Sequence, residues 1–228
     1  MEGMKRYPDK HFDLAIVDPP YGIREDGHRE NHTRSKLARS KQYHTALWNQ
    51  QRPDKNYFQE LLRVSKNQII WGANHLCDLF DAKSPCWVVW NKKVMSGKGN
   101  HFADCELAYC SHSTAVRSFE FEWQGMIQGN MKTKEARQHP TQKPVALYKW
   151  LLKNYAKQGD LILDTHVGSA SSLIACHDMG FDAVGFELDP DYYSASKQRL
   201  DDFMAQPKIE EFITAEREQI TLDGKNDE

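Results

Sequence analysis

The sequence predicts an α/β fold in which helices flank a doubly wound, mostly parallel sheet. Short apolar segments of strand length alternate along the chain with segments of helical periodicity. Three of the apolar segments end in a carboxylate, at Asp18, Asp164 and Glu187, and strand ends of this kind carry the ligand sites of open α/β sheets. The 228 residues suffice for one domain with a full core, so we expect a single domain over 1–228.

The N-terminal part supplies the first strands. An apolar run at 12–17, followed by prolines, predicts a short buried strand. Helical spacing at 57–64 leads into a strand at 68–71, and a short helix is expected at 75–80. A Trp- and Val-rich segment at 86–90 predicts another buried strand.

Two further strands are expected at 104–111 and 118–123, joined as a hairpin through a turn near Ser113. In the second, aromatic residues alternate with glutamates, which is strand periodicity. We expect its phenylalanines to pack in the core.

The C-terminal part alternates regularly between helix and strand. The expected elements are a helix at 144–155, a strand at 160–164, a helix at 168–180, a strand at 182–187 and a helix at 192–203. Pro144 stands near the start of the first helix, a favoured place, and Gly180 closes the second.

Composition limits the class of partner. With 30 basic and 32 acidic residues the net charge is −2, so affinity for a polyanion would have to come from local patches such as the basic run between Arg24 and Lys41. The five cysteines form no CxxC pair, which argues against a metal site and favours a reduced protein. Without a signal peptide or a membrane-length apolar stretch, we expect a cytoplasmic protein that does not bind membranes.

The tetrapeptide Asp18-Pro19-Pro20-Tyr21 follows the first strand. Each proline lacks an N–H and fixes its own φ, so the backbone carbonyls stay available beside a carboxylate and an aromatic ring. Two hydrogen-bond acceptors next to a stacking surface suit an exocyclic amino group on a flat ring.

A second constellation lies at 161–171, where strand, small-residue turn and helix follow one another, with Glu187 at the end of the next strand. Asp164 and Glu187 predict a Rossmann-like site in which one acid meets a cationic or hydroxylic group and the other a ribose diol. Because the GxGxxG phosphate loop is missing, NAD fits poorly, and S-adenosylmethionine, which carries no phosphate, fits better. Just before the 144–155 helix, Lys143 places a cation where the helix dipole disfavours it, so either a bound anion compensates or the side chain is exposed.

These motifs together resemble those of the amino-methylating DNA methyltransferases, which act on adenine N6 or cytosine N4. Asp-Pro-Pro-Tyr resembles their catalytic motif, Thr141-Gln142-Lys143-Pro144 their Thr-x-Lys-Pro motif, and the segment from Asp164 their Asp-Pro-Phe-x-Gly-Ser-Gly-Thr motif. Departures from the last motif are Thr165, His166, Ala170 and Ser171. The order of the three motifs is that of the circularly permuted β class.

The resemblance implies a role for each matching residue. The catalytic residues are Asp18, Pro19, Pro20 and Tyr21. The residues expected at S-adenosylmethionine are Thr141, Lys143, Asp164, His166, Gly168, Ser169 and Glu187. The resemblance further implies transfer of a methyl group to adenine N6 of a base flipped out of DNA, stacked on Tyr21 and held by Asp18 and the Pro19 carbonyl.

DNA is the expected partner, contacted by a basic loop at 22–55 and a small target-recognition insertion at 94–138. The residues expected to contact it are Arg24, Arg29, Arg34, Lys36, Arg39, Lys132, Lys134 and Arg137. Relatives often form a homodimer or act with a partner restriction nuclease, and the sequence leaves both open for this chain. Two other functions stay open: methylation of cytosine N4 or of an RNA or protein amide nitrogen, and a degenerate methyltransferase fold that binds nucleic acid without catalysis.

Overall fold

The computed structural model describes residues 1–22, 52–93, 103–124, 127–129, 132, 134–139 and 141–206. A seven-stranded sheet forms its centre. The strands are β1 (Phe12–Val17), β2 (Ser65–Trp71), β3 (Trp87–Asn91), β4 (Cys105–Cys110), β5 (Arg117–Glu120), β8 (Leu161–Asp164) and β9 (Asp182–Gly185). The helices are η1 (Met4–Arg6), α1 (Lys55–Val64), η3 (Ala73–His75), α2 (Val145–Tyr155), α3 (Ser171–Met179) and α4 (Pro190–Met204). A separate two-stranded sheet pairs β6 (Trp123–Gln124) with β7 (Ile127–Gln128).

The strand order in the main sheet is β5-β3-β4-β2-β1-β8-β9. Only β4 runs antiparallel to its neighbours, so the predicted mostly parallel, doubly wound sheet is confirmed. The chain leaves β1 for β2 on one side and β8 for β9 on the other. The order therefore reverses between β1 and β8, and such a reversal opens a crevice at the carboxyl ends of the two strands.

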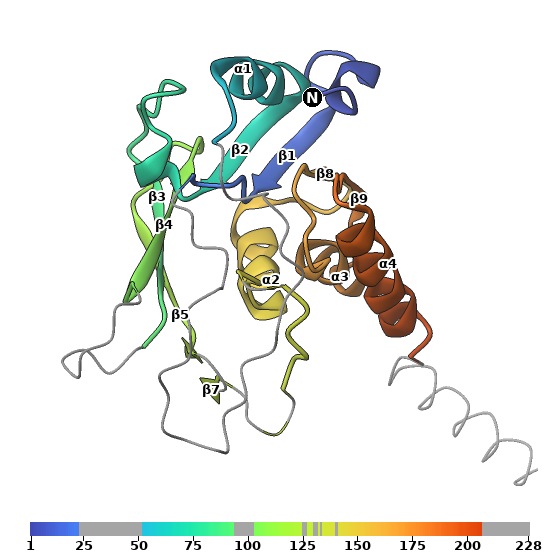
Figure 1. The fold of residues 1–228 in the computed structure, drawn as a ribbon. Coiled ribbons are helices and arrows are strands. Elements are labelled where there is room, and N and C mark those ends of the chain that lie inside the picture. Colours follow the sequence, from blue (N-terminus) through green and yellow to red (C-terminus); the bar gives the residue numbers. More distant parts are fainter. Residues whose placement is uncertain are drawn as a thin grey trace, which may run out of the picture.

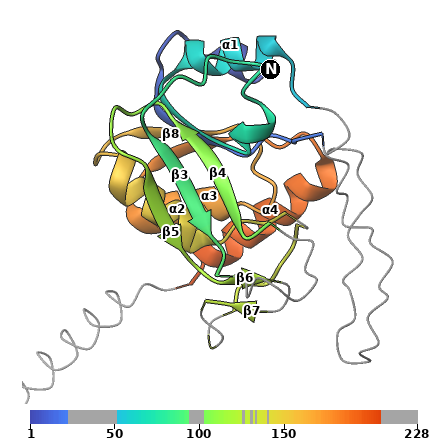
Figure 2. The same cartoon turned by 90° about the vertical axis from the view of Figure 1, so that its left-hand side faces the viewer.

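Helices cover both faces of the sheet (Figures 1 and 2). On one face, α1 buries Tyr57, Phe58, Leu61 and Val64 against β1 and β2. On the other face, α2 packs beside α3, and the two share a core cluster with inward-facing residues of six strands. α4 packs on α3 at the β9 edge of the molecule. Leu14 and Ile16 face α2, whereas Ala15 and Val17 face α1, as the two-residue strand period requires.

Three predicted elements need correction. The helix expected at 75–80 is the short η3, followed by turns, because the 3₁₀ segment begins directly after the left-handed Gly72. The expected hairpin of 104–111 with 118–123 does not form. Instead β3 lies between β4 and β5 and pairs with β5 in parallel. The second strand also stops at Glu120, and Trp123 begins the small β6–β7 sheet.

The 94–138 segment therefore divides into two parts. Its described strands β4 and β5 belong to the main sheet, whereas the small β6–β7 sheet that follows Glu120 lies outside it. Phe119 and Phe121 pack against the core cluster, as predicted. All five cysteines are free; Cys77 and Cys105 are exposed and the other three are buried. None of the helices in the described part of the chain is both long and apolar enough to cross a bilayer.

Candidate active site

The carboxyl ends of β1 and β8, the region called the crevice below, bring together motifs that lie far apart in the sequence. Asp18 follows β1 directly, Asp164 ends β8, and Lys143 lies in the turn before α2. Since β1 and β8 are hydrogen-bonded neighbours, the two aspartates end adjacent strands. The strand order therefore brings Asp18 and Asp164 to the same end of the sheet.

Both carboxylate oxygens of Asp18 have partners in this structure. The Tyr21 hydroxyl donates to Asp18 Oδ1 at 2.5 Å, and the Lys143 ammonium forms an ion pair with Asp18 Oδ2. Lys143 also donates to the Tyr21 hydroxyl oxygen at 3.2 Å. Aspartate, tyrosine and lysine thus form a closed triangle of charge-assisted hydrogen bonds.

Lys143 is buried, with a side chain only 3% exposed, so the alternative of an exposed lysine is wrong. Its second ion pair is with Glu106 Oε2 at 3.2 Å. Burial alone would lower the pKa of Lys143, but the charges of Asp18 and Glu106 outweigh it and raise the pKa. Asp18 and Glu106 are therefore the anions that offset the unfavourable helix dipole at Lys143, and they keep this lysine charged.

Glu106 on β4 is a site residue that the sequence analysis missed. Its Oε2 forms the ion pair with Lys143, and its Oε1 lies 2.6 Å from the Lys92 ammonium nitrogen. Burial would raise the pKa of Glu106, yet the two lysines bring it down to about 2. A lone glutamate in a strand gives no local signal for this role, because its partners lie on other elements.

The Tyr21 ring is held by the residues that follow β2. It stacks on His75 with ring centroids 5.4 Å apart, and the Lys143 ammonium lies 5.8 Å from its centroid. Gly72, at φ +65°, lies so close that an added Cβ would come within 2.0 Å of the ring. Only glycine leaves room for Tyr21 there.

The β8 side of the crevice has a different electrostatic character. Asp164 is 2% exposed and accepts hydrogen bonds from the Ser172 hydroxyl at 2.5 Å and the His166 N–H at 2.9 Å. No lysine or arginine among the described residues forms an ion pair with it. Burial therefore raises the pKa of Asp164 to about 7, and the nearby charges of Asp18 and Glu187 act in the same direction.

Glu187 lies two residues beyond β9, which ends at Gly185 rather than at the predicted position. Its carboxylate accepts from the Gly168 N–H at 2.8 Å and from the Asp189 N–H at 3.0 Å. It therefore bridges the β8–α3 and β9–α4 turns. A cavity of about 240 Å³ lies beside Glu187 between α3 and α4, but neither Asp18 nor Asp164 lines it, so it is separate from the crevice.

His166 and Thr141 are two further cofactor candidates. His166 packs edge-on to Tyr57, and both Tyr57 and His166 share a hydrogen bond with the Thr165 hydroxyl, at 2.6 and 2.9 Å. Burial lowers the pKa of His166 to about 4, so its imidazole is neutral. Thr141 is exposed, and its hydroxyl lies 3.1 Å from Nδ1 of the buried His139.

The turn from Gly168 to Ser171 departs from the predicted start of α3, which begins at Ser171 rather than Gly168. Ser169 and Ala170 are buried. Ala170, which stands where the resembled motif has glycine, adopts a left-handed conformation at φ 61°. A non-glycine residue is strained in this region of backbone space.

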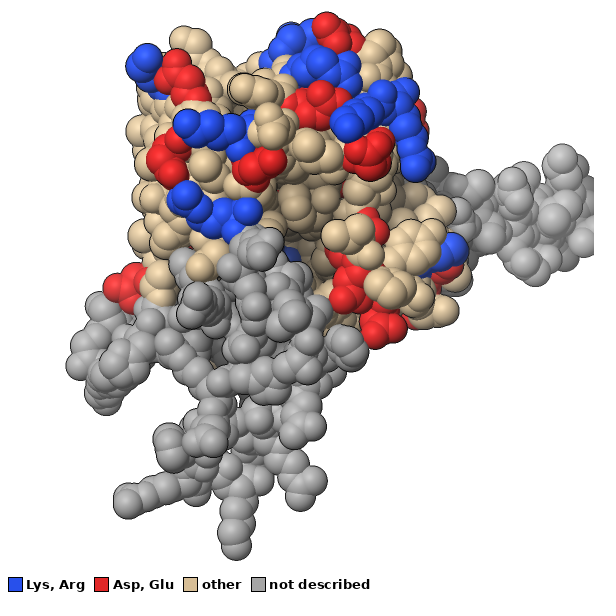
Figure 3. All heavy atoms as spheres, turned by 45° about the horizontal axis from the view of Figure 1, so that its top comes forward, with Lys and Arg blue, Asp and Glu red and all other residues tan. Residues whose placement is uncertain are grey.

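The expected DNA contacts divide into two groups. Arg24, Arg29, Arg34, Lys36 and Arg39 lie outside the described residues, as does most of the 22–55 segment. Lys132 and Lys134 are exposed, whereas the half-buried Arg137 stacks its guanidinium over the Trp123 ring at 4.6 Å. On the face that carries α1, basic and acidic side chains are interspersed (Figure 3).

Comparisons with known proteins identify the family of this chain. The family model described as DNA methylase, for N6 and N4 methyltransferases, matches residues 81–198. Among curated proteins, the type II methyltransferase M2.DpnII of Streptococcus pneumoniae is 32% identical over 140 residues, which are 59% of this chain and 50% of that protein. The type II methyltransferase M.HpaI of Haemophilus parainfluenzae is 35% identical over 68 residues, 30% of this chain and 22% of that protein.

Two solved structures share the fold at low sequence identity. The M1.HpyAVI–SAM complex has a TM-score of 0.51 at 14% identity, covering 87% of this chain and 91% of that one. The PvuII DNA methyltransferase, named as cytosine-N4-specific, has a TM-score of 0.53 at 13% identity, covering 93% and 86%. The chain spans half the length or less of the curated relatives it matches. Because the family model covers more than half of its 228 residues, this chain belongs to the DNA methylase family of N6 and N4 methyltransferases.

Proposed function

We propose that this protein transfers a methyl group from S-adenosylmethionine to the N6 amino group of an adenine flipped out of DNA. The observation that carries the proposal is the meeting of Asp18 with its two neighbours, Tyr21 and Lys143, one strand away from the buried acid Asp164. Family membership, and curated relatives that are named type II methyltransferases, support the reaction class.

The donor set on the β8 side suits this cofactor. Asp164 is a buried carboxylate whose described partners are neutral donors, so it lacks a counter-charge that a sulfonium or an ammonium group would provide. Glu187 keeps acceptor capacity for ribose hydroxyls beyond the two backbone N–H groups that it holds. When bound, the cofactor supplies an electrophilic methyl group at its sulfonium sulfur.

The β1 side suits the target amino group. Lys143 fixes Asp18 Oδ2, while Oδ1 accepts from the Tyr21 hydroxyl. An amino group entering the crevice replaces that hydroxyl as the donor to Oδ1, and the Pro19 carbonyl accepts its second hydrogen. Both acceptors turn the nitrogen lone pair away from ring conjugation, so catalysis consists of positioning and electrostatic stabilisation.

Aspartate at the first position of the tetrapeptide favours adenine N6 over cytosine N4 by the family resemblance. Exposed Lys132 and Lys134 supply charges for DNA phosphate on the side of the β6–β7 sheet. The intact Asp18–Tyr21 motif argues against a degenerate fold that binds nucleic acid without catalysis.

The test is to incubate the purified protein and S-adenosylmethionine with unmethylated genomic DNA and to sequence for modified bases. We expect N6-methyladenine at one short sequence motif. N4-methylcytosine instead would replace the adenine assignment, and modification of neither base would contradict the proposed activity. Calorimetry with S-adenosylmethionine then separates an inactive cofactor-binding fold from one that binds no cofactor.

A further inference from the structure

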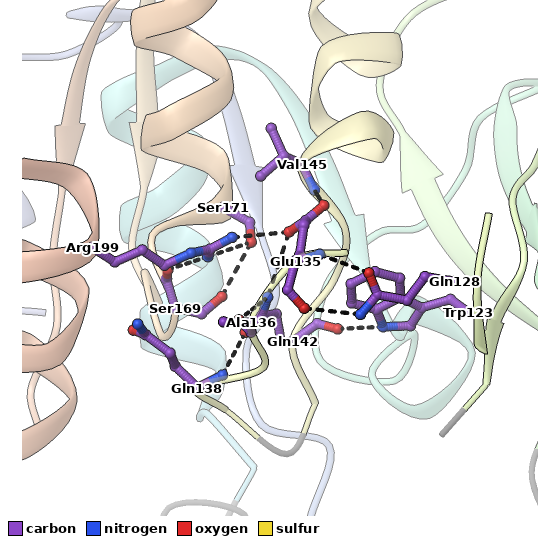
Figure 4. Close-up of polar contacts among 10 residues, drawn as sticks. All are labelled: Trp123, Gln128, Glu135, Ala136, Gln138, Gln142, Val145, Ser169, Ser171 and Arg199. Carbon is purple, nitrogen blue, oxygen red and sulfur yellow. Dashed lines mark hydrogen bonds and ion pairs between the residues drawn. The ribbon is translucent and has the colours of Figure 1, made fainter. Parts of the chain in front are cut away.

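Arg199 on α4 reaches the turn that precedes α3. Its Nη1 donates to the Ser169 carbonyl at 2.5 Å and to the Ser171 hydroxyl at 3.0 Å. The side chain is only 12% exposed. Figure 4 shows the guanidinium lying between these two serines and Glu135.

The residue between the two serines is the strained Ala170, at φ 61°. Strained backbone of this kind persists where surrounding contacts over-determine it. Arg199 bonds the residue on either side of Ala170, and the Ala170 N–H donates to the Val167 carbonyl at 2.9 Å. The arginine is thus placed to hold the turn in its left-handed form.

Glu135 holds Arg199 from the opposite side. Its Oε2 accepts from Arg199 Nη2 at 2.9 Å, and its Oε1 accepts from the Val145 N–H at the start of α2 at 2.9 Å. The backbone of Glu135 pairs in both directions with the Gln128 side chain on β7, at 2.8 and 2.9 Å. The Glu135 carboxylate therefore joins α4 to the start of α2, and the Glu135 backbone joins both to the small sheet outside the main fold (Figure 4).

We propose that Arg199 and Glu135 are positioning residues: Arg199 clamps the strained turn at Ala170 in the form that binds cofactor, and Glu135 anchors Arg199 to the segment around β7. The ligand's identity rests on the proposed function, whereas the clamp itself is a property of the fold. Because Glu135 also belongs to the 94–138 segment, the conformation of that segment and of the cofactor turn are linked through one ion pair.

The first test compares Arg199→Met with Arg199→Met/Ala170→Gly. Hydrogen exchange of residues 167–172, without cofactor, should speed up about tenfold in Arg199→Met. Glycine removes the left-handed strain, which corresponds to a factor of roughly 5 to 30 in a local equilibrium, so the double variant should recover most of the protection. Calorimetric affinity for S-adenosylmethionine should fall and recover in parallel.

Glu135→Gln tests the anchor. A glutamine at this position keeps an oxygen to accept from the Val145 N–H, but it presents an amide donor to Arg199. It should weaken cofactor binding about as much as Arg199→Met, and it should add little in the Arg199→Met background. Asp178→Asn and Lys149→Met are the matched controls, since they break an ion pair between α3 and α2 that does not touch the turn. Both controls should leave exchange at 167–172 unchanged.

Unchanged exchange at 167–172 in Arg199→Met would overturn the clamp, and so would faster exchange that Ala170→Gly fails to reverse. Additive effects of Glu135→Gln and Arg199→Met would overturn the anchor. If the wild-type protein binds no S-adenosylmethionine but the exchange pattern holds, the proposed function fails and the clamp stands.

Discussion

The carboxylates in the two halves of the crevice have opposite electrostatic surroundings. On the β1 side, Asp18 and Glu106 meet Lys143, and Glu106 also meets Lys92, so the carboxylates are neutralised by the chain itself. On the β8 side, Asp164 accepts hydrogen bonds from the Ser172 hydroxyl and the His166 N–H, and burial raises its pKa to about 7. The comparison indicates where a cationic ligand would be favoured: beside Asp164, and not beside Asp18.

Removing the cation on the β1 side should have the largest effect on stability. Lys143→Met leaves Asp18 and Glu106 without their shared partner, and breaking a buried pair costs about 3–5 kcal/mol. The two carboxylate side chains keep 17% and 24% exposure, so we expect about 3 kcal/mol in chemical denaturation. Lys66→Met, which breaks the exposed pair with Asp13, should cost less than about 1 kcal/mol. Equal losses of unfolding free energy in the two variants would contradict the interpretation that Lys143 neutralises Asp18 and Glu106.

Asp18→Ala should abolish most methyl transfer while cofactor affinity changes little. The carboxylate is expected to hold the target amino group, and loss of a charge-assisted bond of about 1.5–3 kcal/mol predicts a roughly ten- to hundredfold or greater fall in rate. Single-turnover methylation and calorimetry measure the two quantities separately. Asp201→Ala, which removes an exposed carboxylate on α4, is the control. Transfer within tenfold of wild type would remove Asp18 from the catalytic role.

On the β8 side, affinity for S-adenosylmethionine should depend on pH through Asp164. A cation favours the ionised carboxylate, so affinity should rise by up to about tenfold per unit below pH 7 and level off above it. Asp164→Asn should bind weakly with a flat profile. Calorimetry between pH 6 and 8 provides the measurement, and a flat profile for the wild type would refute the cation site.

The stability of the cofactor-free protein should follow pH in the opposite direction. Because folding raises the pKa of Asp164 above its unfolded value of about 3.9, its contribution is fully present below about pH 4 and is lost as pH rises to about 7. The free energy of unfolding should therefore fall between pH 5.5 and 7 more steeply in the wild type than in Asp164→Asn. Parallel curves for the two proteins would show that Asp164 does not titrate there.

The smallest effect is expected from Tyr21→Phe. This variant removes the hydroxyl that bonds Asp18 but keeps the ring stacked on His75. Because the target amino group is expected to replace this hydroxyl as the donor to Asp18 Oδ1, methyl transfer should change by less than roughly tenfold. Tyr21→Ala should lose clearly more, because it removes the stacking surface for the base. If the two variants lose activity equally, the hydroxyl and not the ring is what matters.

Local sequence patterns determined most of the elements and both halves of the crevice. Strands β1 and β8 follow from apolar runs that end in aspartate, and α1, α2 and α4 follow from helical spacing. These patterns work because a buried face imposes its period on neighbouring residues of one segment. The strand ends at Asp18 and Asp164 could therefore be predicted as a ligand edge before any contact was known.

Only the tertiary structure decided which side chains meet across segments. Lys143 lies 122 residues from Tyr21, and Glu106 enters the site from a strand whose sequence carries no motif. The position of β5 beside β3, and the reach of Arg199 to a turn 30 residues earlier, likewise depend on how the chain crosses over. Periodicity predicts that a side chain is buried, but it does not predict which residue that side chain contacts. The ion pairs that set the charge of this crevice could therefore not be predicted from the sequence alone.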